Sequence, residues 1–167
     1  DDCKERIDAA RAAYDKSSAN VKALITEEQL KVLTDAETAY YALDEADVSK
    51  NIEKVTEDDV EYYVLKDSRE LKWFVKLVNG TLSGGATANP SANAKLGADI
   101  TVNEAVLGAD YTLLATDAEE WVPFKEFNGI LDGAGHSING IYINYVREDT
   151  TESPEIHAMF LKNSGTI

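Results

Sequence analysis

The sequence contains few cysteine, proline and methionine residues. Its 167 residues include one cysteine, Cys3, along with three prolines and one methionine. A single cysteine excludes an intrachain disulfide and a cysteine-based zinc cluster. The sequence around Cys3 has no motif typical of an activated cysteine, so we expect no thiol catalysis there.

Basic residues are also scarce. There are 16 lysines and arginines against 31 acidic residues, and the net charge is −15. A nucleic-acid-binding protein needs clustered basic side chains to neutralise phosphates, and an anionic membrane surface attracts the same residues. We therefore expect no nucleic-acid partner and no binding to anionic membranes.

Long apolar runs are missing as well. No run approaches the roughly 18 apolar residues that span a bilayer, so we expect no membrane insertion. No signal peptide is visible, and the chain opens at Asp1 without an initiator Met. We interpret the sequence as a mature or excised fragment. The hydrophobic content of 44% is that of a globular chain.

Residues 1–50 have a helical pattern. The segment is rich in alanine, and apolar residues recur every three or four positions. We expect a small bundle of about three helices, the last beginning at an N-cap at Thr26 with an acidic first turn. Two stripes should form its core: Ile7, Ala10, Ala13 and Tyr14, then Leu30, Leu33, Ala36, Tyr40 and Leu43.

Three stretches of this segment carry a family resemblance. They read Ala-Ala-Arg-Ala-Ala-Tyr-Asp at 9–15, Val-Lys-Ala-Leu-Ile at 21–25 and Leu-Thr-Asp-Ala-Glu-Thr-Ala-Tyr at 33–40. Together they resemble a helical spacer repeat of Gram-positive surface proteins over residues 5–45. Such modules often begin with an additional apolar helix, for which this sequence has no room.

The second half changes period. Residues 51–61 are polar and are interpreted as a linker. Residues 62–65 form a short β-type run, and the Asp67-Ser68 pair predicts the cap of a helix whose apolar positions are Leu71, Phe74, Val75 and Val78. Asn79-Gly80 should close that helix.

Beyond this helix the sequence predicts a solenoid of short strands. A mobile loop is expected over 81–94, and strands over 94–101 and 111–115. Residues 127–143 then place four glycines between strand-forming residues, a pattern that suits stacked coils better than hairpins.

Five elements in this half match a second family in order. They are Ser-Arg-Glu-Leu-Lys-Trp-Phe at 68–74 with Leu-Val-Asn at 77–79, the strand at 94–100, Trp-Val-Pro-Phe at 121–124, the glycine-rich run at 127–143, and Ala-Met-Phe with Ser-Gly-Thr-Ile near the end. The order resembles bacterial surface proteins with GLUG-type repeats. Ala158 replaces the first glycine of that repeat, and the loops at 81–94 and 144–156 are expanded.

The resemblance implies an α+β fold. Residues 62–167 would form the capped N-terminal coils of a right-handed parallel β-helix, truncated at the C-terminal end, after a helical module at 1–50 and the linker at 51–61. A coil without a neighbour leaves an apolar edge. We therefore expect weak self-association near Ala158–Leu161, and strengthening of it by salt.

Few residues favour chemistry. An Asp/His pair such as Asp132 and His136 could serve acid–base catalysis or bind a metal, but the family resemblance makes Asp132, Gly133, Gly135 and His136 a structural turn. No G-x-S-x-G, P-loop or HExxH motif is present. Calcium is the alternative ligand for the carboxylates Asp99, Asp110, Asp117, Glu119 and Glu120, which lack the EF-hand order.

We therefore expect no enzyme activity, no cofactor and no metal. Trp121, before a turn proline, is the candidate ligand contact. The leading hypothesis is a non-catalytic structural or binding region of an exported bacterial cell-surface protein, on a Gram-positive cell wall, that contacts an extracellular protein or glycan. The alternative is the non-catalytic N-terminal region of a large secreted enzyme, such as an IgA-specific metallopeptidase or a carbohydrate-active enzyme.

Overall fold

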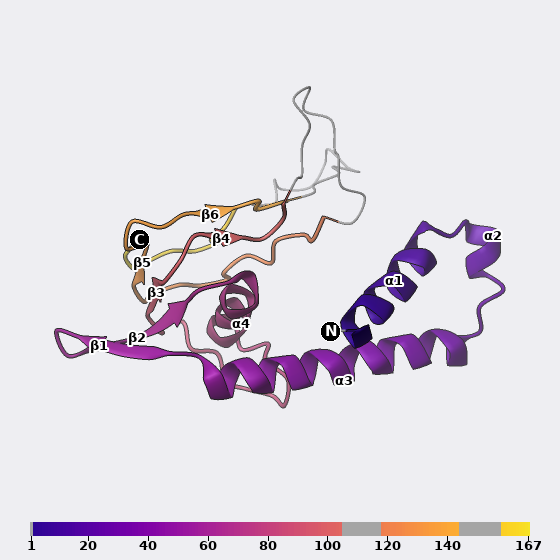
Figure 1. The fold of residues 1–167 in the computed structure, drawn as a ribbon, viewed down its shortest axis with the longest axis horizontal. Coiled ribbons are helices and arrows are strands. Elements are labelled where there is room, and N and C mark those ends of the chain that lie inside the picture. Colours follow the sequence, from indigo (N-terminus) through magenta and orange to yellow (C-terminus); the bar gives the residue numbers. More distant parts are fainter. Residues whose placement is uncertain (1, 105–117, 144–157) are drawn as a thin grey trace, which may run out of the picture. The chain divides into compact units, whose positions relative to one another are not determined.

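The chain folds into mixed helices and small sheets (Figure 1). The computed structural model describes residues 2–104, 118–143 and 158–167. Two compact units divide the chain, residues 1–47 and residues 48–167. None of the helices described is long and apolar enough to cross a membrane. The α+β class expected from the sequence is confirmed at this level.

The first unit contains the three expected helices, α1 (Asp2–Lys16), α2 (Ala19–Lys22) and the start of α3 (Glu27–Asn51). Thr26 caps α3 as predicted. Its Oγ1 accepts a hydrogen bond from the Gln29 backbone N–H at 3.2 Å, and Gln29 Oε1 accepts one from the Thr26 N–H at 3.0 Å. This reciprocal capping box satisfies two donors that the first helical turn leaves free. The short α2 is capped by Ser18.

The apolar stripes of this unit are less buried than the sequence predicts. Leu30, Leu33 and Tyr40 are half-buried, but Ala36 is exposed and Leu43 is 73% exposed. The prediction that Ala36 and Leu43 belong to a core is wrong. Half-buried residues of α3 lie at helical spacing from Glu37, whose side chain pairs with Arg11 of α1. Helix α1 covers only this face of α3, so apolar residues on the other face of α3 stay exposed.

The second unit begins with a β-hairpin. Strand β1 (Lys54–Glu57) pairs antiparallel with β2 (Val60–Leu65) around Asp58 and Asp59, which have φ values of 48° and 64°. The prediction of a linker over 51–61 is therefore wrong. Charged β1 residues are stabilised by cross-strand partners, because Lys54 Nζ lies 3.0 Å from Glu61 and 4.6 Å from the centre of the Tyr63 ring.

Helix α4 (Ser68–Asn79) has the predicted caps. The Asp67 side chain accepts a hydrogen bond from the Glu70 N–H, and Gly80 ends the helix in the left-handed conformation at φ 69°. A side chain on Gly80 would also collide with the Ala88 backbone, whose nitrogen lies 2.6 Å from the Cβ position. The predicted apolar positions are buried, together with Trp73: Leu71, Trp73, Phe74, Val75 and Val78.

Short strands follow α4 and pair in parallel. Strands β3 (Ala94–Leu96) and β4 (Ile100–Thr101) replace the single strand expected over 94–101. Strand β3 lies between β2 and β5 (Leu131–Asp132) in the sheet order β1-β2-β3-β5, and β4 pairs with β6 (Ile138–Asn139). Residues 81–93 contain no helix or strand. The strand expected over 111–115 lies outside the described residues.

An aromatic cluster occupies the core of the second unit. The rings of Phe124 and Phe160 stack with centroids 4.7 Å apart and planes 10° apart, and Phe74 from α4 packs edge-on against Phe124. The side chains with almost no exposed surface are Phe74, Phe124, Phe127, Leu65, Leu71, Ile100 and Val78. Burial of such side chains contributes about 1.5–3 kcal/mol each, so the cluster is the main stabilising element.

Candidate functional site

The defining feature of the second unit is a ladder of three levels. Level 1 comprises residues 92–103, level 2 the described residues 121–143, and level 3 residues 158–167. Level 3 lies beside level 2 through parallel bridges between Phe124 and Phe160, Phe127 and Asn163, and Ile130 and Thr166. Each partner lies 36 positions further along the chain, the separation also of the ion pair between Glu126 and Lys162.

Level 2 lies beside level 1 at nearly the same separation. Ile130 and Asn93 are 37 positions apart, and Ser137 and Asp99 are 38 apart. The backbone follows the same path at each level, because β3 pairs with β5 and β4 with β6 (Figure 1). The chain thus returns over itself with a period of 36 to 38 residues.

Four side chains form hydrogen bonds that connect level 2 and Glu119 to earlier segments of the chain. Asn79 Oδ1 accepts from the Lys125 N–H at 2.9 Å, Asn93 Oδ1 from the Ile130 N–H at 2.9 Å, and Asp99 Oδ1 from the Ser137 N–H at 2.8 Å. Asn103 accepts from the Glu119 N–H at 2.8 Å and donates to the Gly140 carbonyl at 2.8 Å. These bonds satisfy backbone groups at bends where no strand partner is available. Sequence reasoning missed them, because single Asn and Asp residues in loops carry no distinguishing pattern.

Asp99 is the acidic member of this set. Hydrogen bonds from the Ser137 N–H and hydroxyl hold the pKa of the Asp99 carboxyl below its usual range, with a smaller contribution from His136. His136 Nδ1 lies 3.6 Å from Asp99 Oδ1, beyond hydrogen-bonding distance. Both side chains are exposed, at 37% for His136 and 70% for Asp99. This geometry is that of a surface turn rather than of an enclosed acid–base pair.

The segment from Asp132 to His136 forms a tight turn. Asp132 Oδ1 accepts from the Ala134 N–H at 2.8 Å, and the Gly133 carbonyl accepts from the His136 N–H at 2.7 Å. Ala134 and Gly135 adopt positive φ values of 49° and 84°. The four residues singled out in the sequence thus lie together around one turn before β6, where Asp132 and Gly133 accept from backbone N–H groups of the turn. Asp132 Oδ2 also lies 3.6 Å from Lys95 Nζ.

The Trp121 side chain is buried, whereas a ligand contact would have to be exposed. Its side chain is 5% exposed and belongs to the hydrophobic core. The indole Nε1 donates to the Met159 carbonyl at 3.3 Å, and the ring packs at 6.2 Å from Phe124. The prediction of Trp121 as a ligand contact is therefore wrong. The ring fills the space between levels 2 and 3, and its polar atom is used within the fold.

The acidic residues considered for calcium do not assemble in the part of the chain that the structure describes. No group of three or more His, Cys, Asp or Glu side chains there could hold a metal ion. Glu119 pairs with Lys72, while Asp99 accepts from Ser137. Asp110 and Asp117 lie outside the described residues.

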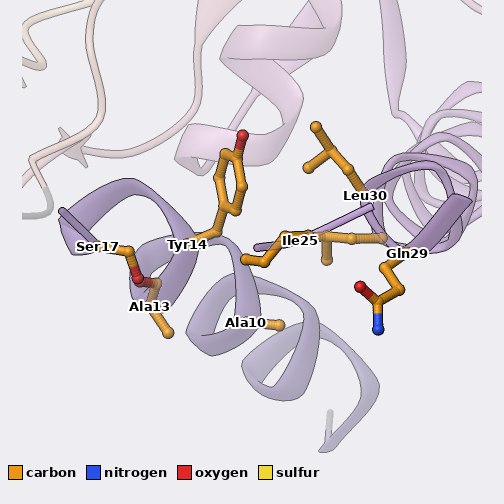
Figure 2. A pocket seen from close by; sticks show the side chains of 8 residues that line it. Ala10, Ala13, Tyr14, Ser17, Ile25, Gln29 and Leu30 are labelled. Atoms are coloured by element: carbon orange, nitrogen blue, oxygen red, sulfur yellow. The ribbon is translucent and has the colours of Figure 1, made fainter. Parts of the chain in front are cut away.

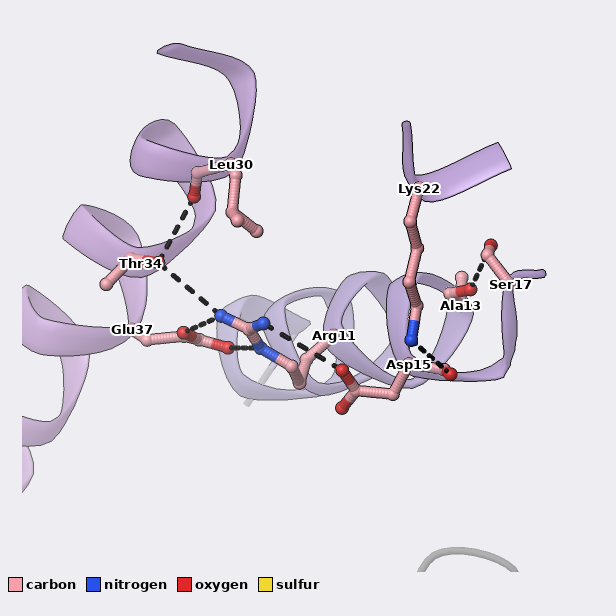
Figure 3. A network of polar contacts seen from close by, with 8 residues as sticks. All are labelled: Arg11, Ala13, Asp15, Ser17, Lys22, Leu30, Thr34 and Glu37. Carbon is pink, nitrogen blue, oxygen red and sulfur yellow. Dashed lines mark hydrogen bonds and ion pairs between the residues drawn. The ribbon is translucent and has the colours of Figure 1, made fainter. Parts of the chain in front are cut away.

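A polar network joins α1 and α3 in the first unit (Figure 3). Arg11 Nε and Nη2 donate to the two Glu37 oxygens, both at 2.7 Å, and Nη2 lies 3.5 Å from Thr34 Oγ1. The two bonds lower the pKa of Glu37 and raise that of Arg11. A bidentate pair of this kind fixes the register of two helices, and the network is structural.

A shallow hollow of about 280 Å³ lies between these helices (Figure 2). Ser17 and Gln29 are polar residues on its wall, but the Ser17 hydroxyl donates to the Ala13 carbonyl, and Gln29 Oε1 accepts from the Thr26 N–H. The lining is otherwise apolar or aromatic: Ala10, Ala13, Tyr14, Ile25, Leu30 and Leu33. Because the Ser17 and Gln29 side-chain oxygens are engaged in helix contacts and most of the lining is apolar, this hollow lacks the convergent polar groups of a ligand site.

The chain matches no protein-family model, no curated protein and no solved structure. The resemblances to the helical spacer and to GLUG-type surface proteins therefore stay predictions. Among the described residues, the candidate functional surface is the side of level 3, Phe160 to Thr166, that faces away from level 2, and we call it the level-3 edge.

Proposed function

We propose that this chain is a non-catalytic structural and binding region of an exported bacterial cell-surface protein. In this proposal residues 62–167 are the capped start of a right-handed parallel β-helix, and the preceding helices are a spacer. The region displays a binding surface for an extracellular protein or glycan, in adhesion or host contact.

The observation that carries the proposal is the nearly constant period of the ladder. Three parallel bridges relate level 3 to level 2 by 36 positions, and the contacts between levels 2 and 1 span 37 or 38. Such regular return is typical of solenoids, in which each turn contacts only its neighbours. The right-handed form implied by the sequence resemblance is supported by the β2-α4-β3 connection, since connections between parallel strands of one sheet are right-handed in about 98% of cases.

Cell-surface location is supported by the two sequence resemblances, both to bacterial surface proteins. The strong negative charge is also compatible with a solvated, aggregation-resistant surface. The ladder uses polar side chains at its bends for its own backbone, as Asn93 and Asn103 do. These residues support a scaffold role.

Engineered disulfides test the fold. In a Cys3→Ser background, the pair Glu126→Cys and Lys162→Cys should oxidise readily, because these positions directly precede the bridged residues Phe127 and Asn163 and so lie beside each other on adjacent levels. A control pair, Glu126→Cys with Leu161→Cys, is one residue out of register and should oxidise more slowly. Equal rates for the two pairs would contradict the stacked register.

Fractionation tests the location. In the native host, antibody against this region should label intact cells or the secreted fraction. Protease added to intact cells should remove the signal. Recovery of the protein in the cytosol alone would overturn the proposed location while leaving the fold unaffected.

A further inference from the structure

Strand β1 forms an open edge of the four-stranded sheet. In the order β1-β2-β3-β5 it pairs with β2 on one side, and it lies inside the sequence, between α3 and β2. The hairpin of β1 and β2, at the left of Figure 1, projects from the rest of the second unit. Lys54, Thr56 and Glu57 of β1 are exposed. The outer side of β1 is therefore accessible to another chain.

Two backbone positions of β1 point to this open side. The Val64 N–H donates to the Glu53 carbonyl at 2.9 Å, so these residues form a hydrogen-bonded pair of the antiparallel ladder. Such pairs alternate with pairs whose N–H and C=O groups point away from the partner strand. In the register of the hairpin, the outward residues of β1 are Lys54 and Thr56. Among the described residues, neither has a backbone partner on that side.

The two outward positions suit strand addition. Lys54 and Thr56 are two positions apart, which is the spacing at which an added strand pairs with an edge. One extended segment can therefore satisfy the N–H and C=O groups of both residues at once. Main-chain pairing of this kind is a common mode of peptide recognition.

The Lys54 side chain makes its contacts within the hairpin. A lysine on an edge strand opposes pairing with another chain, because its charge would have to be desolvated. Lys54 Nζ lies 3.0 Å from Glu61 and 4.6 Å from the centre of the Tyr63 ring. The charge of Lys54 is thus balanced by β2, and it does not repel a basic segment that pairs with β1.

The turn beside the edge is acidic. Glu57 pairs with Lys95 at 2.8 Å, whereas the exposed Asp58 and Asp59 form no ion pair with any described residue. A segment added to β1 passes next to this turn, so lysine or arginine side chains on it are attracted there. A second copy of this chain would bring the same carboxylates and a net charge of −15. Charge therefore favours a basic partner over self-pairing.

We propose that the β1 edge binds an extended, basic peptide segment of another protein by strand addition. The segment pairs with the backbone of Lys54 and Thr56, and its basic side chains face Asp58 and Asp59. The contact is short, so binding is weak, and salt weakens it further because salt screens the attraction between opposite charges. The inference does not depend on the proposed cell-surface location, and failure of the fractionation experiment leaves it unaffected.

Peptide binding tests the proposal. The probe is a short, fluorescein-labelled peptide in which valine and lysine alternate, and its anisotropy is measured with the whole chain. Binding should be saturable and should weaken as salt rises, and the same peptide with glutamate for lysine should not bind. A lysine peptide whose backbone amides are N-methylated cannot donate to the edge and should not bind either. Absence of binding by the lysine peptide, or equal binding of its N-methylated form, would overturn the proposal.

Two substitutions at Thr56 locate the contact. Thr56→Pro removes the outward N–H but none of the bonds between β1 and β2, and proline is tolerated on an edge strand whose N–H faces solvent. It should abolish peptide binding, whereas Thr56→Val keeps the N–H and should bind normally. Circular dichroism should show that both variants are folded. Retained binding in Thr56→Pro contradicts the proposal. So does self-association of the chain without peptide that disappears in Thr56→Pro, because it would assign the edge to a second copy.

A double substitution at the turn tests the role of charge without altering the strand. Asp58→Asn with Asp59→Asn removes two carboxylates, and asparagine tolerates the positive φ values of this turn. Binding of the lysine peptide should weaken about tenfold. The control, Glu27→Gln with Glu28→Gln, removes the same charge at exposed positions of α3 and should leave binding unchanged. Equal weakening in the two double variants would show that only net charge matters and would overturn the assignment to this edge.

Discussion

The carbonyl oxygen of Gly129 lies 2.1 Å from the position that a Cβ atom on Gly165 would occupy. The same relationship recurs one level lower, where the Ala92 carbonyl oxygen lies 2.0 Å from the Cβ position of Gly129. Real Cβ atoms do not approach backbone that closely. These two glycines therefore form a column that allows adjacent levels to reach hydrogen-bonding distance.

Gly129→Ala should destabilise the second unit by about 1–3 kcal/mol, because the added methyl group collides with backbone that cannot move aside. Gly133→Ala is the control, since its Cβ would have only the His136 carbonyl oxygen nearby, at 3.7 Å. Urea unfolding followed by tryptophan fluorescence measures the effect on this unit alone, because both tryptophans, Trp73 and Trp121, lie in it. Equal midpoints for the two variants would contradict the column.

Phe124→Ala should lower the free energy of unfolding by about 3–5 kcal/mol. The ring has no exposed surface, and it contacts Phe74, Phe127 and Phe160. The neighbouring Val122 is 59% exposed, so Val122→Ala should change stability by less than about 0.5 kcal/mol. A Phe124→Ala protein as stable as Val122→Ala would show that levels 2 and 3 do not pack as described.

Asn103→Ala should destabilise the second unit by about 1–2 kcal/mol, because it leaves the Gly140 carbonyl and the Glu119 backbone groups without their partner. Asn103→Asp should not restore stability, since a carboxylate cannot donate to the carbonyls. Asn20→Ala, at an exposed position of α2, is the control and should leave the tryptophan-monitored transition unchanged. Full stability of Asn103→Asp would mean that the amide donor is unimportant.

The helical unit should weaken in acid. The bonds from Arg11 lower the pKa of Glu37 in the folded state. A lowered folded-state pKa stabilises the fold above the unfolded pKa of about 4.3, and this stabilisation is lost as the pH falls through the folded value. Glu37→Gln should lose about 1 kcal/mol at neutral pH and show a smaller loss on acidification.

Asp35→Asn is the control for Glu37→Gln. Asp35 is 62% exposed and pairs with Lys31 within α3, so its removal should cost about 0.3–0.5 kcal/mol. Thermal melts followed by circular dichroism between neutral and acid pH compare the variants. An unchanged acid response in Glu37→Gln would show that the pair with Arg11 does not govern it.

Local patterns in the sequence were sufficient to predict where the helices begin and end. Asp67 and Gly80 bound α4 as predicted, and Thr26 begins α3, because capping depends on residues within a few positions of each other. Strand β1 was missed for the opposite reason. Its charged residues indicate a linker, and only the cross-strand partners Glu61 and Tyr63 explain why the segment is extended.

The candidate site was harder to predict, because its geometry depends on residues about 36 positions apart. Trp121 follows two glutamates and precedes Val122 and Pro123, so its neighbours in sequence indicate an exposed side chain. Its burial comes from Phe124 and from Met159 of level 3. The glycine-rich run at 127–143 indicates turns between short strands, whereas Gly129 allows the close contact between levels, as Gly165 does one level further on.

The nearly constant period has a consequence for how the chain reaches its fold. Level 2 closes a loop of 37 or 38 positions onto level 1, and level 3 closes one of 36 positions onto level 2, as Phe160 does on Phe124. The entropy lost in closing a loop depends on the length of that loop and not on the total length of the chain. The capped first level also emerges first during synthesis, so it can template the next one. Folding can then advance in one direction, in steps of nearly equal entropic cost, as the polypeptide is synthesised.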